Sequence, residues 1–401
     1  MRVNEAELSE RSGVAPERIR LFVDLGILEP DNDVFRPPDV QLVRIFEALD
    51  ASGIGPEVIA KLMKEGNWSN AWADLVFPSP FPYLRQTIAE VADELDLPRP
   101  LVGRLYSSWQ IPFPGWDQRV REDDAEVLRM AAMVYTGIGR NEEGTIAVAR
   151  SFGDNLRRIA ETQAHFFREH VEDPLYASGM KMRDAIQTVA LVAQQFIDGT
   201  GRAMQLLHSR HLEHYTFEDV VQNLELSLEQ SGLASRRPRN PPAIAFLDLT
   251  GYTSLTEQEG DEAAVRLAGN LSEMVSETAA RHGGNVVKLL GDGVMFHFKD
   301  PAGAIVCGLD LVDASAARKL PPARVGVNAG SVIFRDGDYF GRTVNIAARV
   351  TDYARPGEVL VTRDALARGT PVGVQTVEIG EVALKGLAQP VSLSSARRAQ
   401  G

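Results

Sequence analysis

The stretch "VVKLLGDGVMFHF", from Val286 to Phe298, has two apolar runs on either side of a Gly-Asp-Gly turn. Apolar runs that flank such a turn are typical of a β-hairpin, and Asp292 supplies the turn chemistry. The turn does not explain Lys288, which lies four residues before the aspartate in an otherwise apolar strand. The sequence therefore predicts a hairpin, and the lysine requires a separate explanation.

Around the hairpin, runs typical of strands alternate with amphipathic helices. "AIAFLDL" is expected to be a buried strand, and an amphipathic helix at 261–282 follows it. After the hairpin come a helix near 302–318, a strand at "RVGVNAG" and a helix at 343–353. The order βαββαβ predicts an α+β sandwich in which helices pack against an antiparallel sheet.

The N-terminal part of the chain has helical periodicity instead. "NEAELSERSGVAPERIRLFVDLGIL" and "TIAEVADELDLPRPLVGRLYSSWQI", which starts at Thr87, share a layout at a shift of 83 residues. Each is followed by a further amphipathic stretch, "DVQLVRIFEALDASGIG" and "DAEVLRMAAMVYTGIG". We interpret this as an internal duplication of a small helical module. The alternative stays open, because two unrelated amphipathic helix pairs can also be aligned in this way.

Composition changes divide the chain into predicted domains. All four tryptophans lie between Trp68 and Trp116, mixed with prolines, which indicates a packed connector rather than a flexible linker. The stretch "ASRRPRNPPA" interrupts every periodic pattern and marks a boundary. The predicted divisions are a first helical module at 1–66, a second module with the aromatic connector at 67–151, connector helices at 152–233, a linker at 234–242 and a C-terminal α+β domain at 243–395.

Length, charge and cysteine content restrict the class of protein. With 401 residues, two to four domains are expected. The net charge of −13 argues against extensive binding to nucleic acid or anionic membranes. The single cysteine, Cys307, cannot form an internal disulfide and fits a reducing compartment. Because the chain lacks a span-length apolar run and a signal-peptide pattern, we expect a cytoplasmic protein without membrane association.

Two aspartates are candidate metal ligands. Asp248 ends the apolar strand "AIAFLD", where burial disfavours a charge, and Asp292 lies in the hairpin turn. Carboxylates at adjacent strand ends provide the hard oxygen ligands that divalent metals bound to phosphates require. Each aspartate taken alone is equally consistent with a cap on the turn that follows it.

Several ordered motifs carry a family resemblance. They are "FLDLTGYTSL", "KLLGDGV", "RVGVNAG" and "DYFGRTVNIAARV", and residues 242–393 containing them resemble the catalytic domain of class III nucleotidyl cyclases. The resemblance implies a ferredoxin-like α+β fold and a head-to-tail homodimer with two equivalent sites at its interface. It also implies that Asp248 and Asp292 bind two Mg²⁺ or Mn²⁺ ions in each site.

The same resemblance implies a reaction, the conversion of ATP to 3′,5′-cyclic AMP and pyrophosphate. Lys288 and Asp338 match the positions that read the purine. A lysine donating to adenine N1 and an aspartate accepting from the N6 amine favour ATP, whereas guanine would mismatch both at about 1–3 kcal/mol each. Guanylate cyclase activity is the nearer alternative, and this pair disfavours it.

The remaining site residues follow from the motifs in the same way. Asn345 and Arg349 are four residues apart, which places them on one helical face. The resemblance implies that Asn345 orients the ribose and that Arg349 stabilises charge on the α-phosphoryl oxygens. Lys385, in "LKGL", matches a position that contacts the terminal phosphates. Backbone N–H groups after Asp248 are expected to bind phosphate, and they belong to Leu249, Thr250 and Gly251.

The N-terminal half carries resemblances of its own. Residues 3–64 resemble the winged helix-turn-helix of MerR-type regulators, and the whole half is similar to the helical, pH-sensitive regulatory region of soluble mycobacterial-type adenylate cyclases. A DNA-binding regulator that uses the cyclase fold as a nucleotide-sensing dimeriser is therefore the alternative function. Residues 1–66 contain eight Lys or Arg and thirteen Asp or Glu, and this net charge of −5 disfavours DNA binding.

Histidines and tryptophans suggest two regulatory inputs. Five of the seven histidines lie in the connector helices, at His165, His170, His208, His211 and His214. They are either solvated helix residues or a sensor that protonates between about pH 5 and 8 and shifts the packing of the connector. The last three spread over more than one helical face, which disfavours a three-histidine metal site. The aromatic connector could also enclose an apolar ligand such as a fatty acid.

Overall fold

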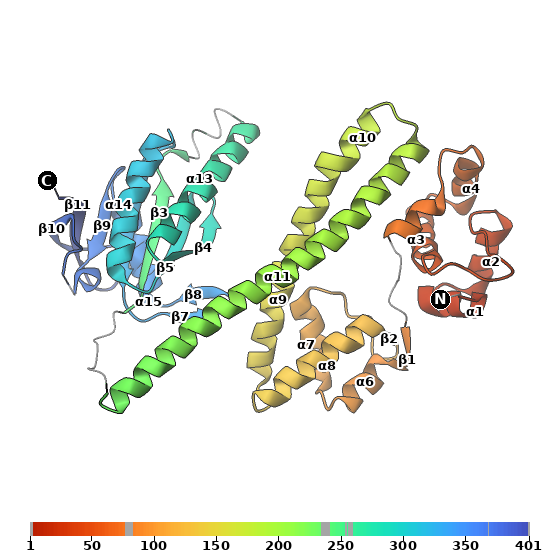
Figure 1. Ribbon diagram of the computed structural model, residues 1–401, viewed down its shortest axis with the longest axis horizontal. Coiled ribbons are helices and arrows are strands. Elements are labelled where there is room, and N and C mark those ends of the chain that lie inside the picture. Colours follow the sequence, from red (N-terminus) through yellow and green to blue (C-terminus); the bar gives the residue numbers. More distant parts are fainter. Residues whose placement is uncertain are drawn as a thin grey trace. The chain divides into compact units, whose positions relative to one another are not determined.

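The computed structural model shows a chain that divides into two compact units, Met1–Ala234 and Ser235–Gly401 (Figure 1). It describes residues 3–76, 83–233, 241–252, 255, 260–367 and 369–399. Most of the predicted linker at 234–242 lies outside these residues. Within the described part of the chain, no helix combines the length and apolar character needed to cross a membrane.

The N-terminal unit contains two helical modules. The first consists of α1 (Glu5–Ser12), α2 (Pro16–Asp24), α3 (Asp39–Ala51) and α4 (Pro56–Lys64). The second consists of α6 (Ile88–Glu94), α7 (Arg99–Trp109) and α8 (Glu122–Gly137). Helices α1 and α6 begin with the same reciprocal capping box, Asn4 with Glu7 and Thr87 with Glu90, again 83 residues apart. The helices of the second module match α1 to α3 in order, and the two capping boxes have the spacing of the sequence repeat.

A small sheet accompanies the second module, although the sequence predicted an all-α N-terminal half. Strand β1 (Tyr83–Thr87) pairs antiparallel with β2 (Arg119–Arg121). Both strands lead directly into helices, and at five and three residues they are too short to show a period-two pattern in the sequence. The helices supply the rest of this module's core, which includes Leu101, Leu105 and Leu128.

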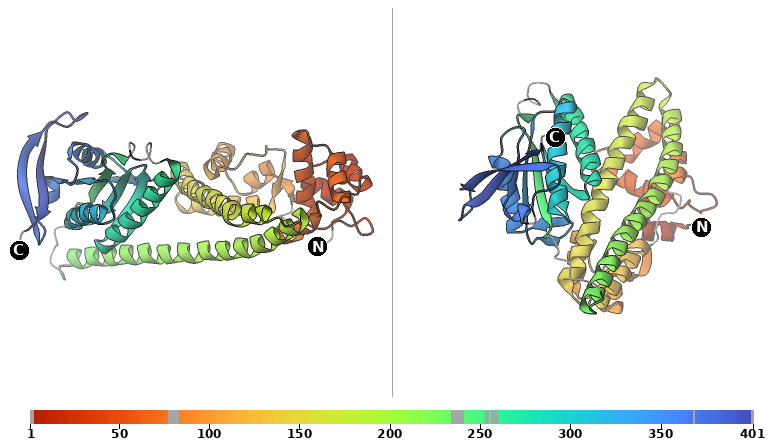
Figure 2. Two further views of the ribbon diagram at one scale, coloured as in Figure 1. Left: turned by 90° about the horizontal axis from the view of Figure 1, so that it is seen from above. Right: turned by 60° about the vertical axis from the view of Figure 1, so that its left-hand side comes forward.

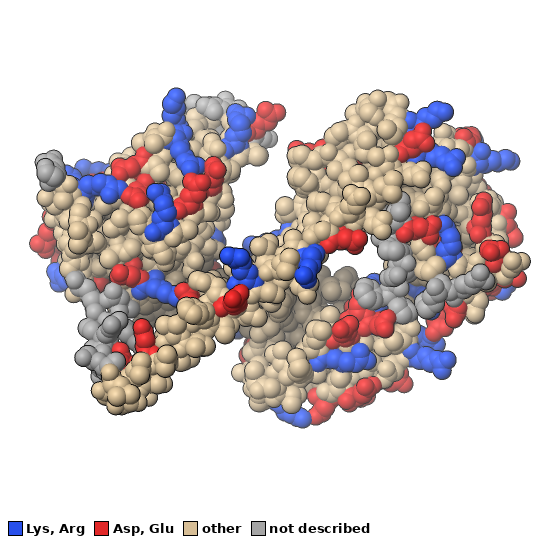
Figure 3. Space-filling view, viewed as in Figure 1, with Lys and Arg blue, Asp and Glu red and all other residues tan. Residues whose placement is uncertain are grey.

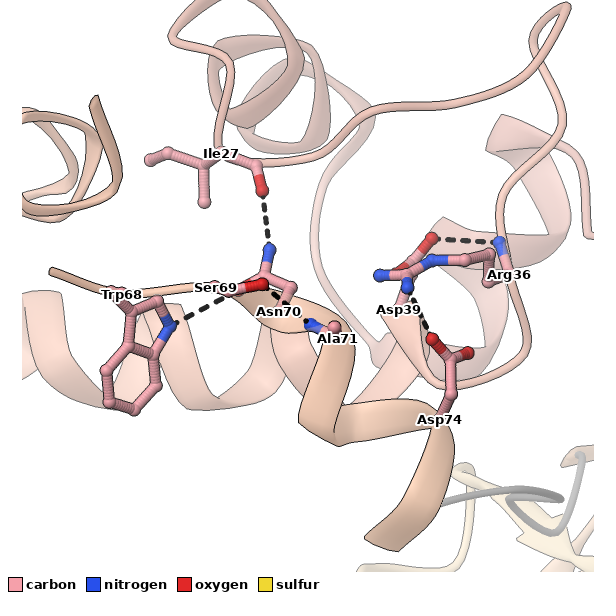
Figure 4. Close-up of polar contacts among 8 residues, drawn as sticks. All are labelled: Ile27, Arg36, Asp39, Trp68, Ser69, Asn70, Ala71 and Asp74. Atoms are coloured by element: carbon pink, nitrogen blue, oxygen red, sulfur yellow. Dashed lines mark hydrogen bonds and ion pairs between the residues drawn. The ribbon is translucent and has the colours of Figure 1, made fainter. Parts of the chain in front are cut away.

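The connector that follows the first module is packed against it (Figure 4). Asn70, at the start of η1 (Asn70–Trp72), is buried and donates from Nδ2 to the carbonyl of Ile27 at 2.7 Å. Arg36 bridges Asp39 at 2.8 Å and Asp74 at 2.6 Å, the latter in α5 (Ala73–Val76). Burial of Asp39 raises the pKa of its carboxyl, and the Arg36 guanidinium opposes that shift. These contacts agree with the prediction of a packed connector for residues 68–76.

Long helices complete the N-terminal unit. Helix α9 (Glu142–Phe167) continues through a π-helical turn (Arg168–Glu172) into α10 (Asp173–Ala177), and α11 (Met182–Gln230) follows. The aromatic rings of Phe166 and Phe196 stack at 5.9 Å, so α9 and α11 pack near the turn (Figure 1, Figure 2). Near the middle of α9, Gly153 crosses α7 so closely that a Cβ there would lie 2.1 Å from the carbonyl oxygen of Ser108.

The C-terminal unit is built on a seven-stranded sheet in the order β10-β11-β9-β6-β3-β5-β4. Its strands are β3 (Ala243–Leu249), β4 (Gly284–Leu290), β5 (Gly293–Phe298), β6 (Ala323–Ala329), β9 (Val359–Thr362), β10 (Val374–Val382) and β11 (Val391–Arg398). The predicted βαββαβ order is confirmed, with α13 (Asp261–Arg281), α14 (Pro301–Ala317) and α15 (Arg342–Tyr353).

The prediction of a purely antiparallel sheet is wrong, because β6 pairs parallel with β9. The connection between these two strands contains the hairpin of β7 (Ile333–Arg335) and β8 (Asp338–Phe340), followed by α15. A parallel pair requires a crossover of a dozen or more residues, and this segment provides it. The sequence pattern of the single strands does not show this pairing.

The two faces of the sheet have different coverings. Alternate residues of β3, such as Ala245 and Leu247, pack in the large core beneath α13 and α14. Ile244 and Phe246 point to the other face, where they pack with Val344 and Ala347 of α15. Side chains alternate strictly along a strand, so Asp248 belongs to this second face, which we call the α15 face.

Candidate active site

The two predicted metal ligands lie at neighbouring strand ends. In the register of β3 and β5, Asp248 is opposite Gly293, the residue that follows Asp292. The N–H of Leu249 donates to the carbonyl oxygen of Asp292 at 3.2 Å, which ties the hairpin turn to the end of β3. Both aspartates are half-buried. The structure therefore brings together two carboxylate residues that are 44 positions apart in the sequence.

Arg324 is part of this group, although the sequence analysis did not include it. It lies directly opposite Asp248 in the register of β3 and β6. Its guanidinium donates from Nε to Oδ2 of Asp248 at 2.8 Å, and its Nη2 contacts the same oxygen at 2.7 Å. Its Nη1 also donates to the carbonyl oxygen of Asp352, at 2.9 Å. Only the strand pairing identifies this residue, since "RVGVNAG" alone shows an arginine at the start of an apolar strand.

A β-bulge explains the position of Lys288. In the pairing of β4 with β5, Val286 is opposite Phe296 and Lys288 is opposite Met295, so Val287 is an extra residue. Without the bulge, Lys288 would point to the same face as Val286, into the apolar core beneath α13 and α14. The bulge instead aligns the lysine with Met295, which packs on the α15 face. The lysine in an apolar strand is thereby directed out of the core.

On that face Lys288 meets Asp338. The Lys288 ammonium forms an ion pair with Oδ2 of Asp338, the first residue of β8. The other carboxylate oxygen, Oδ1, accepts a hydrogen bond from the N–H of Tyr339 at 2.8 Å. The two predicted base-reading residues, 50 positions apart in the sequence, are therefore in direct contact. No hydrogen bond or ion pair among the described residues joins this pair to Asp248, Asp292 or Arg324.

Helix α15 carries the other two predicted catalytic residues. It follows Gly341, whose φ of 122° is a conformation that favours glycine. Asn345 and Arg349 are both exposed on the helix, and Arg349 pairs with Asp352 at 2.8 Å. The helix lies close to the sheet, because a Cβ on Gly326 of β6 would be 2.4 Å from the backbone nitrogen of Thr351.

The predicted phosphate-binding groups differ in their availability. The N–H of Leu249 bonds Asp292, and the N–H of Thr250 donates to the carbonyl of Pro322 at 2.9 Å, so both are used within the fold. Gly251 has a φ of 85°, and most of the motif after Tyr252 lies outside the described residues. The Thr250 hydroxyl is buried and has no hydrogen-bond partner in the described part of the chain. Lys385 is exposed in the connection between β10 and β11.

Two carboxylates with open positions suit a hard divalent ion. Mg²⁺ is commonly held by one or two protein carboxylates together with the phosphates of a substrate, so Asp248 and Asp292 fit that chemistry. The described residues contain no group of three or more His, Cys, Asp or Glu side chains that could hold a metal by themselves. The donor set therefore fits an ion that a phosphate-bearing ligand helps to bind.

Comparisons with known proteins agree with this geometry. The sequence family described as the adenylate and guanylate cyclase catalytic domain matches residues 236–393. A pH-sensitive adenylate cyclase of Mycobacterium tuberculosis is 30% identical over 292 residues, which cover 70% of this chain and 71% of the relative. The chain belongs to the adenylate and guanylate cyclase family. An uncharacterized M. tuberculosis protein is 27% identical over 355 residues, 86% of this chain and 87% of the relative.

Among solved structures, the adenylyl cyclase CyaB from P. aeruginosa aligns with this cyclase at a TM-score of 0.36 and 26% identity. The alignment covers 41% of this chain and 96% of that chain.

The N-terminal unit of the cyclase does not assemble the predicted histidines into one site. All five are exposed along the connector helices. His214 lies 3.6 Å from Glu218, and His170 contacts the carbonyl of Phe166 through Nδ1 at 3.1 Å. His208 lies beside the ring of Phe152, with ring centroids 6.3 Å apart. The arrangement agrees with solvated helix residues, and it leaves the sensor hypothesis as a proposal.

A cavity in the N-terminal unit bears on the predicted apolar ligand. A cavity of about 680 Å³ is lined mainly by apolar side chains, among them Trp68, Trp72, Phe167, Tyr176 and Phe196. Its volume lies within the roughly 300–1,000 Å³ range of small-molecule pockets. Trp68 and Trp72 of the connector thus form part of a cavity wall.

The arginines of α2 that would face DNA are paired with acidic side chains. Arg18 of α2 pairs with Glu47 at 2.8 Å and with Asp50, and Arg20 pairs with Glu5 at 2.7 Å. Figure 3 shows acidic and basic side chains interspersed on the face of this unit that is in view. DNA binding requires unneutralised cations against the phosphates, so these ion pairs disfavour it.

Proposed function

We propose that this cyclase converts ATP to 3′,5′-cyclic AMP and pyrophosphate. The family supplies the type of reaction, and the contact between Lys288 and Asp338 carries the choice of base. The ammonium can donate to adenine N1, and the carboxylate can accept from the N6 amine. Guanine presents an N–H to the lysine and an oxygen to the aspartate, and each mismatch costs about 1–3 kcal/mol. The pair therefore favours ATP over GTP.

Asp248 and Asp292 would hold the two divalent ions, Mg²⁺ or Mn²⁺. When bound, such ions polarise the ribose 3′-hydroxyl and neutralise charge on the triphosphate. Arg324 keeps the carboxylate of Asp248 oriented at the end of β3 through its two contacts with Oδ2. A guanidinium at this place also adds positive charge beside the predicted phosphate site, which favours an anionic ligand.

The reaction is an in-line attack of the ribose 3′-oxygen on the α-phosphorus, with pyrophosphate as the leaving group. We assign Asn345 to orienting the ribose and Arg349 to stabilising the charge on the α-phosphoryl oxygens. Lys385 would contact the terminal phosphates. Of the three predicted phosphate-binding N–H groups, those of Leu249 and Thr250 bond Asp292 and Pro322, so we assign phosphate binding to the Gly251 N–H. Arg349 must leave Asp352 to act in this way, and their exposed ion pair is weak enough to allow it.

The site is proposed to form between two copies of the chain. Within one chain the metal-binding aspartates and the base-reading pair are two separate groups, and Asn345 and Arg349 are exposed on α15. In a head-to-tail homodimer, each site would combine the aspartates of one copy with Lys288, Asp338, Asn345 and Arg349 of the other. This arrangement explains why Lys288 and Asp292 share a hairpin but serve different sites.

The N-terminal half is proposed to regulate the enzyme in signal transduction. The similarity to a relative named as pH-sensitive supports a pH input, for which the five connector histidines are candidates. The apolar cavity supports a second input, an apolar ligand such as a fatty acid, with Trp68 and Trp72 in its wall. The first helical module is proposed to act as a MerR-like scaffold without DNA binding.

The test of the proposed function is cyclic AMP formation from ATP and cyclic GMP formation from GTP, with Mg²⁺ and with Mn²⁺. We expect cyclic AMP from the full chain and a loss of about a thousandfold or more in Asp292→Ala. Glu262→Gln, an exposed acid on α13, is the matched control and should keep full activity. Absence of any product from the full chain under all conditions would reject the enzyme and favour the DNA-binding alternative.

A further inference from the structure

The α15 face contains a buried histidine for which neither the fold nor the reaction so far accounts. His297 lies on β5, two residues beyond Met295, and its side chain is 9% exposed. Its ring lies parallel to that of Tyr339, with centroids 4.3 Å apart and an interplanar angle of 5°. Tyr339 follows Asp338 in β8, so the stack connects His297 to the strand that carries the carboxylate of the base-reading pair.

The hairpin of β7 and β8 depends on such contacts for its position. It forms a two-stranded sheet of its own and does not extend the seven-stranded sheet. Ile333, Phe334 and Phe340 on this hairpin are 65%, 63% and 48% exposed, so much of its apolar surface does not face the core. Tyr339 is half-buried, and it packs against both His297 and Phe334, whose ring centroid is 5.0 Å away.

A short series of contacts connects His297 to the carboxylate that reads the base. The histidine ring stacks on the Tyr339 ring, and the Tyr339 backbone N–H holds Oδ1 of Asp338 at 2.8 Å. The remaining oxygen of Asp338 is the partner of Lys288. A shift of Tyr339 would therefore move the acceptor for the N6 amine relative to the lysine that donates to N1.

The histidine itself is an unusual choice for this position. Its Nδ1 is buried and has no hydrogen-bond partner among the described residues, which costs free energy that a phenylalanine would not incur. Burial, and to a lesser extent the Lys299 ammonium, lower the pKa of His297, so the ring is neutral in the folded protein at neutral pH. A neutral ring offers Tyr339 a flat stacking surface without adding charge beside the Lys288–Asp338 pair.

We propose that His297 is a specificity-positioning residue, whose stack on Tyr339 fixes the β7–β8 hairpin and thereby sets the preference of the site for adenine over guanine. This inference rests on the proposed function, because it concerns how the same site reads its base. His297 touches neither the nucleotide nor the reacting atoms in this account. Its effect passes through Tyr339 to Asp338.

The experiment compares two substitutions of His297 in the full chain. His297→Leu keeps an apolar side chain but removes the flat ring, and His297→Phe keeps a flat ring but removes both nitrogens. For each variant, kcat and KM are measured with ATP and with GTP. We expect His297→Leu to raise KM for ATP and to lower the ATP-to-GTP ratio of kcat/KM by about fivefold, with kcat for ATP nearly unchanged. His297→Phe should restore the ratio.

A merely structural role predicts a different result. Loss of folded enzyme lowers kcat for both nucleotides equally and leaves their ratio unchanged. His282→Leu is the matched control, because it removes the histidine of the same unit whose partner is Asp310 rather than Tyr339. It should reduce thermal stability without changing the ATP-to-GTP ratio. An unchanged ratio in His297→Leu, or a fall in the ratio in His297→Phe equal to that in the leucine variant, would overturn the inference.

A second variant changes Tyr339, the other ring of the stack. Tyr339→Leu, at a half-buried position, should lower the ratio as His297→Leu does, and the double variant should show no further loss because both changes break the same contact. Additive losses would overturn the inference. If His297→Leu does not fold, an unchanged ATP-to-GTP ratio in Tyr339→Leu alone would overturn it. A wild-type chain that forms no cyclic AMP would instead reject the proposed function, independently of these ratios.

Discussion

The two units of this cyclase hold their predicted functional residues in different ways. In the C-terminal unit, strand register and a bulge determine where Asp248 and Lys288 point, and each has a definite partner. In the N-terminal unit, the five candidate histidines are exposed on helices. An exposed side chain on a helix is weakly restricted, whereas strand register and an ion pair together restrict where a side chain points. The geometry therefore supports functional assignments in the C-terminal unit more strongly than in the N-terminal unit.

The largest effect that would sharpen this contrast comes from displacing α15. Gly326→Ala would place a Cβ 2.4 Å from the backbone nitrogen of Thr351, so the helix that carries Asn345 and Arg349 must move. Displacement of catalytic groups by about 1 Å can cost a hundredfold, and we expect a loss of that order in kcat. Steady-state kinetics with ATP measures it.

Gly269→Ala is the control for this substitution. Gly269 lies on α13, and a Cβ there meets no atom within 4 Å. It should keep full activity and gain slightly in stability, because alanine is the better helix former. Equal activity of the two variants would show that the position of α15 does not matter for the reaction, which would break the contrast between the units.

Part of the active site could be predicted from the sequence because its motifs are local. The turn with Asp292, the strand that ends at Asp248 and the helix with Asn345 each show a short-range pattern, and the structure forms all three elements. Arg324 was missed because its role depends on being opposite Asp248 in the sheet, and strand pairing is a long-range property. The parallel pairing of β6 and β9 was missed for the same reason.

Lys288 shows a different limit of sequence patterns. Strict alternation from Val286 would direct it into the apolar core, and a single extra residue at Val287 reverses that direction. No residue in "VVKLL" is typical of a bulge, so only the structure reveals it. The predicted phosphate-binding groups show a further limit, because the N–H groups of Leu249 and Thr250 donate hydrogen bonds within the fold that the local sequence does not indicate.

A smaller effect would distinguish a structural carboxylate from the proposed metal-binding carboxylates in the same unit. Asp310 contacts His282 at 2.7 Å and also pairs with Arg398 of β11. Burial alone would raise the pKa of Asp310, but the hydrogen bonds from His282 and Arg398 outweigh it and hold the pKa below its usual value. Asp310→Asn should lower the thermal unfolding midpoint at neutral pH and leave KM for ATP unchanged.

The pH dependence of that difference follows from the direction of the pKa shift. A carboxyl with a lowered pKa in the folded state stabilises the protein above its unfolded-state pKa of about 3.9, and it loses this contribution as the pH falls through the folded value. The difference in midpoint between wild type and Asp310→Asn should therefore shrink below about pH 4. A difference that stays unchanged as the pH falls well below 4 would contradict the ion-pair assignment.

The smallest expected change in maximal activity tests the N-terminal unit directly. Replacing the five connector histidines with glutamine removes their protonation, while glutamine keeps a polar side chain of similar reach. If their charge controls the connector, the profile of cyclic AMP formation between about pH 5 and 8 should lose its histidine-dependent step, with the maximal rate nearly unchanged. His282→Gln, in the cyclase unit, is the control and should keep the wild-type profile. An identical profile in the fivefold variant would end the sensor proposal, since that variant removes every candidate side chain.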